Sequence, residues 1–495
     1  MDENVIFSKD SQQSPPPVTP TTPPQQPVAA PVVPQTPPPP PAQPAATVGT
    51  PPPPTDTVLP KPPSSSGFGG ILKIAGIVVG VLLIVLAIIF LVLPRFKSTP
   101  KDQPVTLTYW GLFENKQVMQ TLIDDFHLQH PLITINYIQK DIKDYRKSLV
   151  TQITNGNGPD MYRFHNSWVG MMKPYLSTMT ADVMSPTDFK ANFYPVIQQD
   201  LVRNGGLYGV PLEIDTLALF VNNDALSAGG NSVPKTWDEF IKVAKDRVVK
   251  DADGKILTAG AGLGTYDNVT HAPDIIALLM AQNGTDFTNF SKTQNNAAQA
   301  LEFYTAFAKD EGSVWDSTLD PTQTAFAKGN LAMYFGYSWD IFAIKALNPT
   351  LNFSVHPVPN LPGGQKTLAS YWVEGVSSRS PHQKEAMLFM KYLAQKETLQ
   401  KLYTETAKTR LFGEPYPRRD LAQTVKSNPL LAPFLEQANY AVSSYFVSNT
   451  YDDGINDQMN GYLGNAVRSN GSTSGQTAIQ TLAQGVNQVL SKYGQ

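Results

Sequence analysis

Apolar and polar residues alternate at positions 106–110, and this two-residue period is typical of a β-strand with one buried face. Apolar residues then recur every three to four positions from Val118 to Phe126, which predicts a helix, and Pro131 marks its end. The two-residue period returns at positions 133–137. A strand, a helix and a strand in this order predict a βαβ unit, and therefore an α/β fold with a parallel sheet.

Four later segments extend the same mixture of elements. Apolar residues have helical spacing at positions 297–307 and 386–403, and residues that favour strands fill positions 217–221 and 353–358. The chain contains no short internal repeat. The region from about Val105 to the C-terminus is long enough to bury a large core, so we expect it to form a globular α/β domain.

The most apolar stretch of the chain precedes this region, at positions 74–93. About twenty helical residues, at roughly 1.5 Å each, span the ~30 Å hydrocarbon layer of a membrane. Lys73 flanks the stretch on one side, and Arg95 and Lys97 flank it on the other. A cleaved signal peptide explains the stretch less well, because it is too long, lies too far from Met1 and lacks a small-residue cleavage site. We therefore predict a transmembrane helix.

Positions 14–63 consist mainly of Pro, Thr, Gln, Ala and Val. Proline fixes φ and removes a backbone donor, so such a segment favours extended polyproline II over helix or sheet. It also has too few large apolar residues to build a core. We interpret the segment as a disordered spacer. A ligand for SH3-like or WW-like domains is the alternative, but no flanking basic residues support it.

Charge and cysteine content exclude several classes of protein. The formal net charge is −3, and no run of Lys or Arg longer than two interrupts the globular part, which argues against nucleic-acid binding. The chain has no cysteine, so it has no disulfide, no thiolate metal site, no cysteine nucleophile and no lipidated cysteine as an anchor. The apolar stretch at 74–93 is then the element that holds the domain at a membrane.

The motifs of common enzymes are mostly absent. The segment 336–340 lacks the second glycine of a nucleophile elbow, and neither a phosphate-binding loop nor a dinucleotide fingerprint occurs. His127 and His130 fit an exposed helix end better than a metal site, and Asp251 and Asp253 fit a hairpin turn better than a calcium loop. We predict no catalytic residue, no metal site and no cofactor. The paired carboxylates of a glycan-processing enzyme stay open, because their spacing is three-dimensional.

Tryptophans provide the positive signal. Trp110, Trp168, Trp339 and Trp372 each lie at the end of a predicted strand or in a loop, and several have polar neighbours such as Glu374. A flat indole ring beside carboxylates and amides suits a sugar, which offers an apolar C–H face and a rim of hydroxyl groups. Burial in the core is the alternative for each of these rings. Together they favour a carbohydrate-binding surface.

From about Val105 onward, the order of segments resembles that of the extracellular solute-binding proteins of ABC importers, in particular the family that binds sugars and oligosaccharides. The segments that carry the resemblance are LTYW at 107–110, ITNGNGPD at 153–160, GLYGVP at 206–211, DTLALFVN at 215–222 and FAKGNLAM at 326–333. Each segment alone is weak evidence, whereas their order and spacing over the whole region are specific.

The resemblance implies an α/β, two-lobed periplasmic-binding-protein-like fold, with hinge segments that cross near 212–216 and 335–345. It implies a noncatalytic protein whose lobes close over a carbohydrate, in particular an oligosaccharide, and which delivers it to the permease subunits of an ABC importer. By position in the family pattern, the resemblance implies these ligand-binding residues: Trp110, Glu114, Asp160, Asp215, Trp339, Trp372, Glu374, Tyr416 and Arg418.

We expect four regions: a Pro-rich arm at 1–66, a transmembrane anchor at 67–97, a linker at 98–104 and the solute-binding domain at 105–495. Flanking charges slightly favour a cytoplasmic domain, but the resemblance implies an extracytoplasmic one. We therefore expect a monomeric, single-pass protein of the cell membrane. Its anchor departs from the family, and a sensor or receptor for a peptide or polyol is one alternative. A membrane-tethered glycan-processing enzyme and an adhesive surface domain are others.

Overall fold

The computed structural model describes residues 103–361, 364–469 and 475–493. The Pro-rich segment, the predicted transmembrane helix and the start of the linker lie outside the described residues. Within the described ranges, no helix is both long and apolar enough to cross a membrane.

The first three elements form the βαβ unit that the alternating pattern predicts. β1 (Val105–Gly111) pairs in parallel with β2 (Ile133–Gln139), and α2 (Lys116–Gln129) connects them. The side chain of Asn115 accepts a hydrogen bond from the backbone N–H of Val118 at 2.9 Å, which caps the start of α2. The structure thus confirms this part of the prediction.

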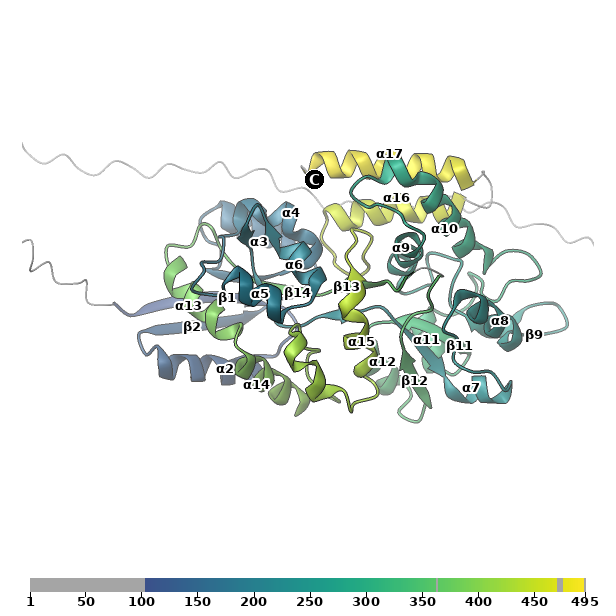
Figure 1. Ribbon diagram of the computed structural model, residues 1–495, viewed down its shortest axis with the longest axis horizontal. Coiled ribbons are helices and arrows are strands. Elements are labelled where there is room, and N and C mark those ends of the chain that lie inside the picture. The colour runs from purple at the N-terminus through teal and green to yellow at the C-terminus, as the bar shows by residue number, and fades with distance from the viewer. Residues whose placement is uncertain (1–102, 362–363, 470–474, 494–495) are drawn as a thin grey trace, which may run out of the picture. The chain divides into compact units, whose positions relative to one another are not determined.

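These strands belong to a five-stranded sheet with the order β2-β1-β3-β14-β6, which forms the core of lobe 1. β3 is Met161–His165, β14 is Trp372–Val376 and β6 is Val210–Pro211. β14 runs antiparallel to β3. It follows the strands of lobe 2 in the sequence, so lobe 1 is built from two separate parts of the chain. The helices of lobe 1, at the left of Figure 1, are α3 (Tyr145–Thr154), η3 (Asn166–Trp168), α4 (Val169–Met172), η4 (Lys173–Tyr175), α5 (Pro186–Asn192), α6 (Pro195–Leu201), α13 (Gln383–Leu393) and α14 (Lys396–Ala407).

A second five-stranded sheet, with the order β12-β8-β11-β10-β9, forms the core of lobe 2. Its strands are β8 (Ala218–Asn222), β9 (Val249–Lys250), β10 (Ile256–Ala261), β11 (Leu331–Gly336) and β12 (Phe353–His356). Every residue of β8 and β11 is buried, as expected for central strands with both faces covered. The helices of lobe 2 are α7 (Asn223–Ala228), α8 (Trp237–Arg247), α9 (Ala272–Gln282), η5 (Phe290–Thr293), α10 (Gln294–Ala306), α11 (Thr322–Ala327), α12 (Asp340–Leu347), α16 (Ile455–Ser469) and α17 (Gly475–Lys492).

A three-stranded sheet, β15-β13-β7, contains the crossings between the lobes. The chain leaves lobe 1 after β6 and enters lobe 2 through β7 (Asp215–Thr216), and it returns through β13 (Thr367–Ser370) into β14. A third crossing, through η6 (Arg419–Val425), α15 (Ala432–Gln437), η7 (Ala438–Tyr440) and β15 (Ala441–Val442), leads to α16. Outside these sheets, β4 (Val202–Arg203) and β5 (Gly206–Leu207) form a short hairpin.

Two predicted features differ in the structure: one crossing segment and one helix. The segment 335–345 does not cross between the lobes, because β11 pairs with β8 and β10 inside lobe 2 and α12 packs back against α11. The predicted helix at 386–403 is two helices, α13 and α14. The break occurs at Gln395, whose extended backbone (φ −69°, ψ 147°) interrupts a hydrophobic pattern that itself continues.

Candidate functional site

A cavity of about 360 Å³ lies where segments of both lobes meet. On the lobe 1 side it lies near the carboxyl ends of β1, β2 and β3, the usual position of a ligand in an open α/β sheet. Three of the predicted ligand-binding residues, Asp215, Trp339 and Trp372, line it. The full lining is Phe113, Ile142, His165, Glu213, Asp215, Ser338, Trp339, Phe342, Ser370, Trp372, Arg410, Glu414, Ser448, Asn449, Thr450 and Tyr451.

Exposed aromatic rings concentrate in this cavity. Among the described residues, the aromatic side chains that expose more than a third of their surface are Phe113 at 49%, Tyr451 at 47% and Trp339 at 39%. All of them line the same cavity, although they come from lobe 1, from the segment before α16 and from lobe 2. Large apolar rings normally avoid water, so their convergence on one hollow indicates a binding surface.

The lobe 1 wall is aromatic and uncharged. Trp372, at the start of β14, is only 8% exposed, and three rings surround it edge-on: Phe113 at 5.3 Å, His165 at 5.0 Å and Trp168 at 5.2 Å between centroids. The Nε2 atom of His165 lies 3.0 Å from the hydroxyl of Ser370. Burial lowers the pKa of His165 to about 3, so this imidazole is neutral at physiological pH.

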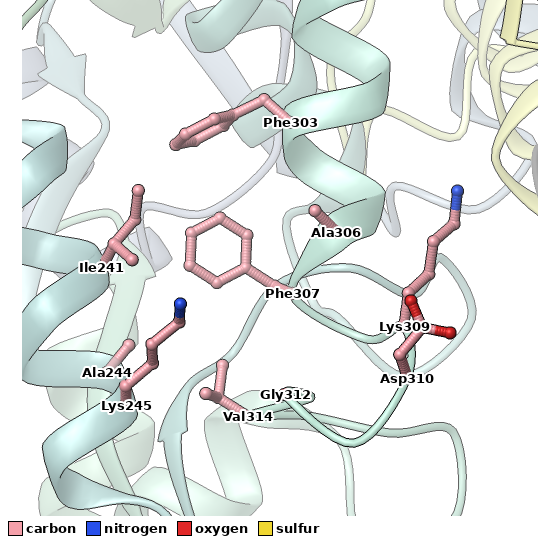
Figure 2. Close-up of a pocket in the computed structure, with 10 residues that line it drawn as sticks. All are labelled: Ile241, Ala244, Lys245, Phe303, Ala306, Phe307, Lys309, Asp310, Gly312 and Val314. Atoms are coloured by element: carbon pink, nitrogen blue, oxygen red, sulfur yellow. The ribbon is translucent and has the colours of Figure 1, made fainter.

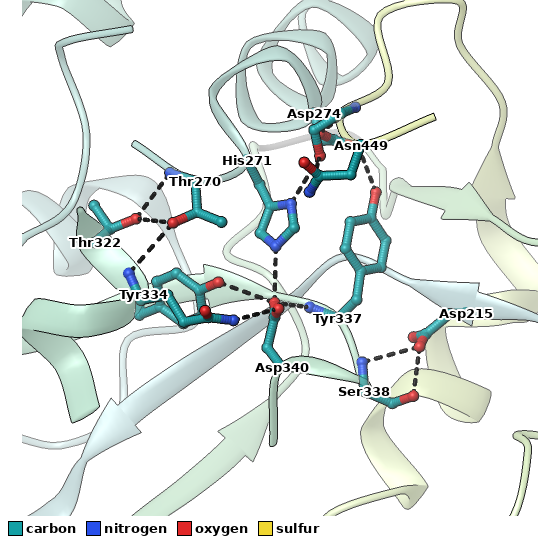
Figure 3. Close-up of polar contacts among 12 residues, drawn as sticks. Asp215, Thr270, His271, Asp274, Thr322, Tyr334, Tyr337, Ser338, Asp340 and Asn449 are labelled. Atoms are coloured by element: carbon teal, nitrogen blue, oxygen red, sulfur yellow. Dashed lines mark hydrogen bonds and ion pairs between the residues drawn. The ribbon is translucent and has the colours of Figure 1, made fainter. Parts of the chain in front are cut away.

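The lobe 2 wall presents the face of an indole. Trp339 lies between β11 and α12 and stacks on Tyr337, with ring centroids 4.4 Å apart and an angle of 15° between the planes. The hydroxyl of Tyr337 donates a hydrogen bond to Asp274 Oδ1 at 2.7 Å, so the supporting ring is itself fixed (Figure 3). One face of Trp339 is thus held by the protein while the ring borders the cavity.

A buried polar network beneath Trp339 holds its loop in place (Figure 3). One oxygen of Asp340, Oδ2, accepts hydrogen bonds from His271 Nε2 at 2.8 Å, from the Tyr334 hydroxyl at 2.9 Å and from the backbone N–H of Tyr337 at 3.0 Å. Burial alone would lower the pKa of His271, but the carboxylates of Asp340, Asp274 and Asp215 together outweigh it and raise the pKa above the ordinary value. The network therefore fixes the turn that carries Trp339 from below.

Asp215 fixes the same turn from the hinge side. Its Oδ2 accepts hydrogen bonds from the backbone N–H of Ser338 at 2.9 Å and from the Ser338 hydroxyl, and its Oδ1 accepts one from Thr216 N–H at 2.8 Å. Burial raises the pKa of Asp215 to about 8, and the hydrogen bonds from Ser338 partly oppose this rise. The first crossing strand is thereby bonded to the loop of Trp339 in lobe 2.

Two glutamates form an acidic edge of the cavity. Glu213 and Glu414 lie on segments joined by a backbone hydrogen bond from Ile214 N–H to the Pro415 carbonyl at 3.0 Å. The carboxylate of Glu414 also forms an ion pair with Arg410. Burial, and then the neighbouring Glu414, raise the pKa of Glu213 well above its usual range, so this pair can share a proton. Carboxyl groups in this state can accept and donate hydrogen bonds to hydroxyl groups.

Two of the predicted ligand-binding residues, Glu114 and Glu374, lie in the interior of lobe 1 rather than at the cavity. Both are buried beside Arg163, whose Nε donates to Glu374 Oε1 at 2.6 Å and whose Nη1 contacts Glu114 Oε2. None of the three side chains lines the cavity. In this structure, the carboxylates near Trp110 and Trp372 in sequence therefore contact a buried arginine.

The other four predicted residues also lie away from the cavity wall. Trp110 is covered by Lys140, whose Nζ lies 3.9 Å from a ring centroid, and Tyr416 stacks on Tyr403 at 5.1 Å. Asp160 accepts a hydrogen bond from the backbone N–H of Thr108 at 2.8 Å and ties β1 to the start of β3. The remaining residue is Arg418, whose Nε and Nη2 both donate to the Asp420 carboxylate at 3.0 Å.

Comparison with known proteins identifies the family of this chain. The family model for "bacterial extracellular solute-binding protein" matches residues 121–433 of the chain. The chain belongs to this family. The match begins in α2 and ends in α15, so it covers β2, β3, β6 and β14 of the lobe 1 sheet, all of the lobe 2 sheet and the hinge strands β7 and β13.

Relatives with assigned ligands are similar over most of the domain. The multiple sugar-binding protein of Streptococcus mutans is 25% identical over 329 residues, which are 62% of this chain and 75% of the relative. The maltodextrin-binding protein MdxE of Bacillus subtilis is 22% identical over 59% of this chain and 69% of its own length. A solved cyclo/maltodextrin-binding protein in complex with maltotetraose has a TM-score of 0.64 at 19% identity and covers 78% of this chain and 98% of that structure. This structural likeness establishes the two-lobed fold.

The sequence predictions did not include most of the polar residues that line the cavity between the lobes. Glu213 lies two positions before Asp215, so the sequence around the first crossing does contain a signal for it. Arg410, Glu414 and Tyr451 carry no comparable signal, because they lie far along the chain: Arg410 and Glu414 follow α14, and Tyr451 follows the third crossing.

A second cavity differs from this one in chemistry and position. Figure 2 shows it within lobe 2, where Ile241 and Ala244 of α8 face Phe303, Ala306 and Phe307 in and after α10. Its volume is about 320 Å³. No residue of lobe 1 lines it, so closure of the two lobes cannot enclose a ligand there.

Proposed function

We propose that this solute-binding protein captures a carbohydrate, and specifically an oligosaccharide, between its lobes and presents it to an ABC importer. The observation that carries the proposal is the convergence of the exposed aromatic rings Phe113, Trp339 and Tyr451 on one cavity. A pyranose offers apolar C–H faces that pack on such rings and hydroxyl groups that need hydrogen-bond partners at the rim. The carboxyl groups of Glu213 and Glu414 line the same cavity and supply such partners.

The position of the cavity supports a mechanism by hinge closure. Trp372 belongs to lobe 1 and Trp339 to lobe 2, and the strands β7 and β13 between them carry Asp215 and Ser370. Rotation of the lobes about these strands brings the two indole walls together around a ligand and removes it from water. The relatives named as sugar-binding and maltodextrin-binding proteins support the same ligand class for this chain.

We also propose that the apolar stretch at 74–93 anchors the chain and leaves the domain from about Val105 outside the cell. The family is described as extracellular, and the chain has no cysteine that a lipid could modify. The stretch has the length of a membrane-spanning helix. Protease treatment of intact cells tests this topology: the domain should be cleaved, and the Pro-rich arm at 14–63 should be protected.

Trp339→Ala tests the binding proposal. We expect the detergent-solubilised full chain to gain thermal stability with a neutral oligosaccharide from a library that includes maltotetraose, because a ligand of the folded state stabilises it. Trp339→Ala should reduce the affinity for that sugar roughly tenfold, the equivalent of about 1.4 kcal/mol of lost stacking, in isothermal titration.

Leu347→Ala is the matched control, because Leu347 is also exposed in lobe 2 and does not line the cavity. Its affinity should equal that of the wild type. Unchanged affinity in Trp339→Ala would contradict the stacking role of Trp339. Conversion of the oligosaccharide to shorter products would show that the chain is a glycan-processing enzyme instead.

A further inference from the structure

A row of buried polar side chains connects α16 to the wall of the cavity. It begins at Asn456 in α16, continues through Ser167 in η3 and His165 at the end of β3, and reaches Ser370 in the crossing strand β13. All four residues are at most 7% exposed, and two of them, His165 and Ser370, line the cavity. Protein partners therefore determine the direction of the hydrogen bonds between them.

The amide of Asn456 has one possible orientation. Its Nδ2 donates to the Tyr445 carbonyl at 2.8 Å, and its Oδ1 accepts from the indole N–H of Trp168 at 3.2 Å. An indole nitrogen only donates and a carbonyl oxygen only accepts, so exchange of the amide oxygen and nitrogen would place donor against donor and acceptor against acceptor. Asn456 Oδ1 therefore also accepts the hydrogen bond of the Ser167 hydroxyl, at 2.8 Å.

This bond fixes the tautomer of His165. The Ser167 hydroxyl oxygen lies 2.7 Å from Nδ1 of His165, and its single proton is already donated to Asn456, so Nδ1 carries a proton and donates it to Ser167. The backbone N–H of Ser167 also approaches Nδ1, but at 3.3 Å this contact is the longer of the two and is given up. Burial lowers the pKa of His165 to about 3, so the ring holds one proton and Nε2 has none.

The direction of the last bond follows from this tautomer. Across the 3.0 Å contact, the Ser370 hydroxyl donates and Nε2 of His165 accepts. Among the described residues, this hydroxyl has no other hydrogen-bond partner. Its lone pairs therefore remain for a group in the cavity, whereas its proton does not.

We propose that Ser370 is a specificity-determining residue that accepts a hydrogen bond from a hydroxyl group of the bound sugar, and that His165 is the positioning residue that holds it in this state. The inference rests on the proposed carbohydrate function. The carboxyl groups of Glu213 and Glu414 can accept or donate, because they can share a proton. Ser370 can only accept, so a ligand atom without a proton at this point leaves a buried acceptor unpaired.

The tautomer can be measured without any ligand, from proton–nitrogen correlation spectra of the detergent-solubilised full chain with isotope-labelled histidine. The signals of His165, identified by their loss in His165→Gln, should show a protonated Nδ1 and an unprotonated Nε2. Ser167→Ala removes the acceptor of the Nδ1 proton and should move this proton to Nε2. A wild-type His165 with its proton on Nε2 overturns the proposal whether or not a sugar binds.

The role of Ser370 can be measured by isothermal titration with maltose and its monodeoxy and monodeoxyfluoro derivatives, or with those of another neutral sugar if that one stabilises the chain instead. At the ring position that contacts Ser370, both replacements should lower the affinity of the wild type about tenfold, because neither hydrogen nor fluorine can donate a proton. In Ser370→Ala, the parent sugar should bind about tenfold more weakly, and the two replacements should cost nothing further. Ser354→Ala is the matched control, because the Ser354 hydroxyl also contacts a histidine, 2.7 Å from His356 Nε2, but does not line the cavity.

The outcomes separate the two proposals. If the wild-type chain binds no neutral sugar, the carbohydrate function fails, and the recognition of a sugar hydroxyl fails with it. If a sugar binds and the losses persist in Ser370→Ala at every ring position, only the role of Ser370 fails. A fluoro derivative that binds like the parent, at the position where the deoxy derivative depends on Ser370, would show that Ser370 donates and would overturn the proposed direction of the bond.

Discussion

The cavity is bordered by two tryptophans that the protein holds in opposite ways. Trp372 is 8% exposed and packs edge-on against Phe113, His165 and Trp168, whereas Trp339 is 39% exposed and contacts Tyr337 through one face. Trp372 therefore serves mainly as part of the lobe 1 core, and Trp339 is the more available surface for a ligand. The comparison shows that a shared cavity and a shared residue type do not imply a shared role.

The supports beneath the two rings differ as well. In lobe 1, the fully buried Arg163 lies between two buried carboxylates, Glu114 and Glu374. In lobe 2, Asp340 pairs with His271, whose pKa it raises, and also accepts hydrogen bonds from the neutral donors Gln323 and Tyr334. Removal of one partner of a buried ion pair greatly lowers the free energy of unfolding, because it leaves an uncompensated buried charge. The two walls should therefore respond differently to mutation.

Arg163→Met should have the largest effect and breaks the lobe 1 support. It leaves Glu114 and Glu374 buried without a cation, and we expect the free energy of unfolding to fall by about 3–5 kcal/mol in urea denaturation. Lys328→Met is the matched control, because Lys328 pairs with Asp320 at 2.7 Å on the surface. This control should lose less than about 1 kcal/mol. Equal losses in the two variants would show that the buried triad does not support lobe 1.

Trp372→Ala sharpens the contrast between the two rings. Removal of a buried indole leaves a cavity, and we expect a loss of about 3 kcal/mol in the free energy of unfolding. Trp339→Ala should lose less than about 1 kcal/mol, since much of its surface already faces solvent. Thermal unfolding of both variants without sugar measures the difference. A larger loss in Trp339→Ala would reverse the assignment of structural and binding roles.

The same contrast explains what the sequence could predict. Alternation and helical spacing predicted β1, α2 and β2, because these elements obey local periodicities. An aromatic residue after a strand predicted that Trp339 and Trp372 border a cavity, but it could not distinguish exposure from burial, which depends on Trp168 and His165. The local sequence pattern does not determine which aromatic rings come into contact after folding.

The positions of the charged neighbours depend on distant parts of the chain in the same way. Glu114 and Glu374 lie close to tryptophans in sequence and suggested hydrogen-bond partners for a ligand, yet both bind Arg163, which is 211 positions away from Glu374. Nothing in the sequence around Arg163 marks it as their partner. Tyr451 was missed because it reaches the cavity on a loop with a positive φ, which a hydrophobic pattern does not report.

Asp215→Asn, which changes the support of the Trp339 turn, should have the smallest effect on stability. Burial raises the pKa of Asp215 to about 8 from an ordinary value near 4, so the folded state holds a proton that the unfolded chain releases. Between about pH 4 and pH 8 the folded state therefore binds more protons, and the stability contribution of Asp215 falls as the pH rises. Asparagine does not titrate but can still accept the hydrogen bond from Ser338 N–H.

Melting temperatures of Asp215→Asn should therefore decline less between pH 5 and pH 8 than those of the wild type. Asp267→Asn is the control, because the Arg468 guanidinium lowers the pKa of Asp267, which then titrates below this range. The melting temperature of Asp267→Asn should change with pH as that of the wild type does. If Asp215→Asn also keeps the wild-type slope, Asp215 is ionised throughout the range, and the hinge strand holds the turn of Trp339 through a charge. A flatter slope means that a bound proton replaces that charge, so that the hinge strand holds the turn of Trp339 through neutral hydrogen bonds.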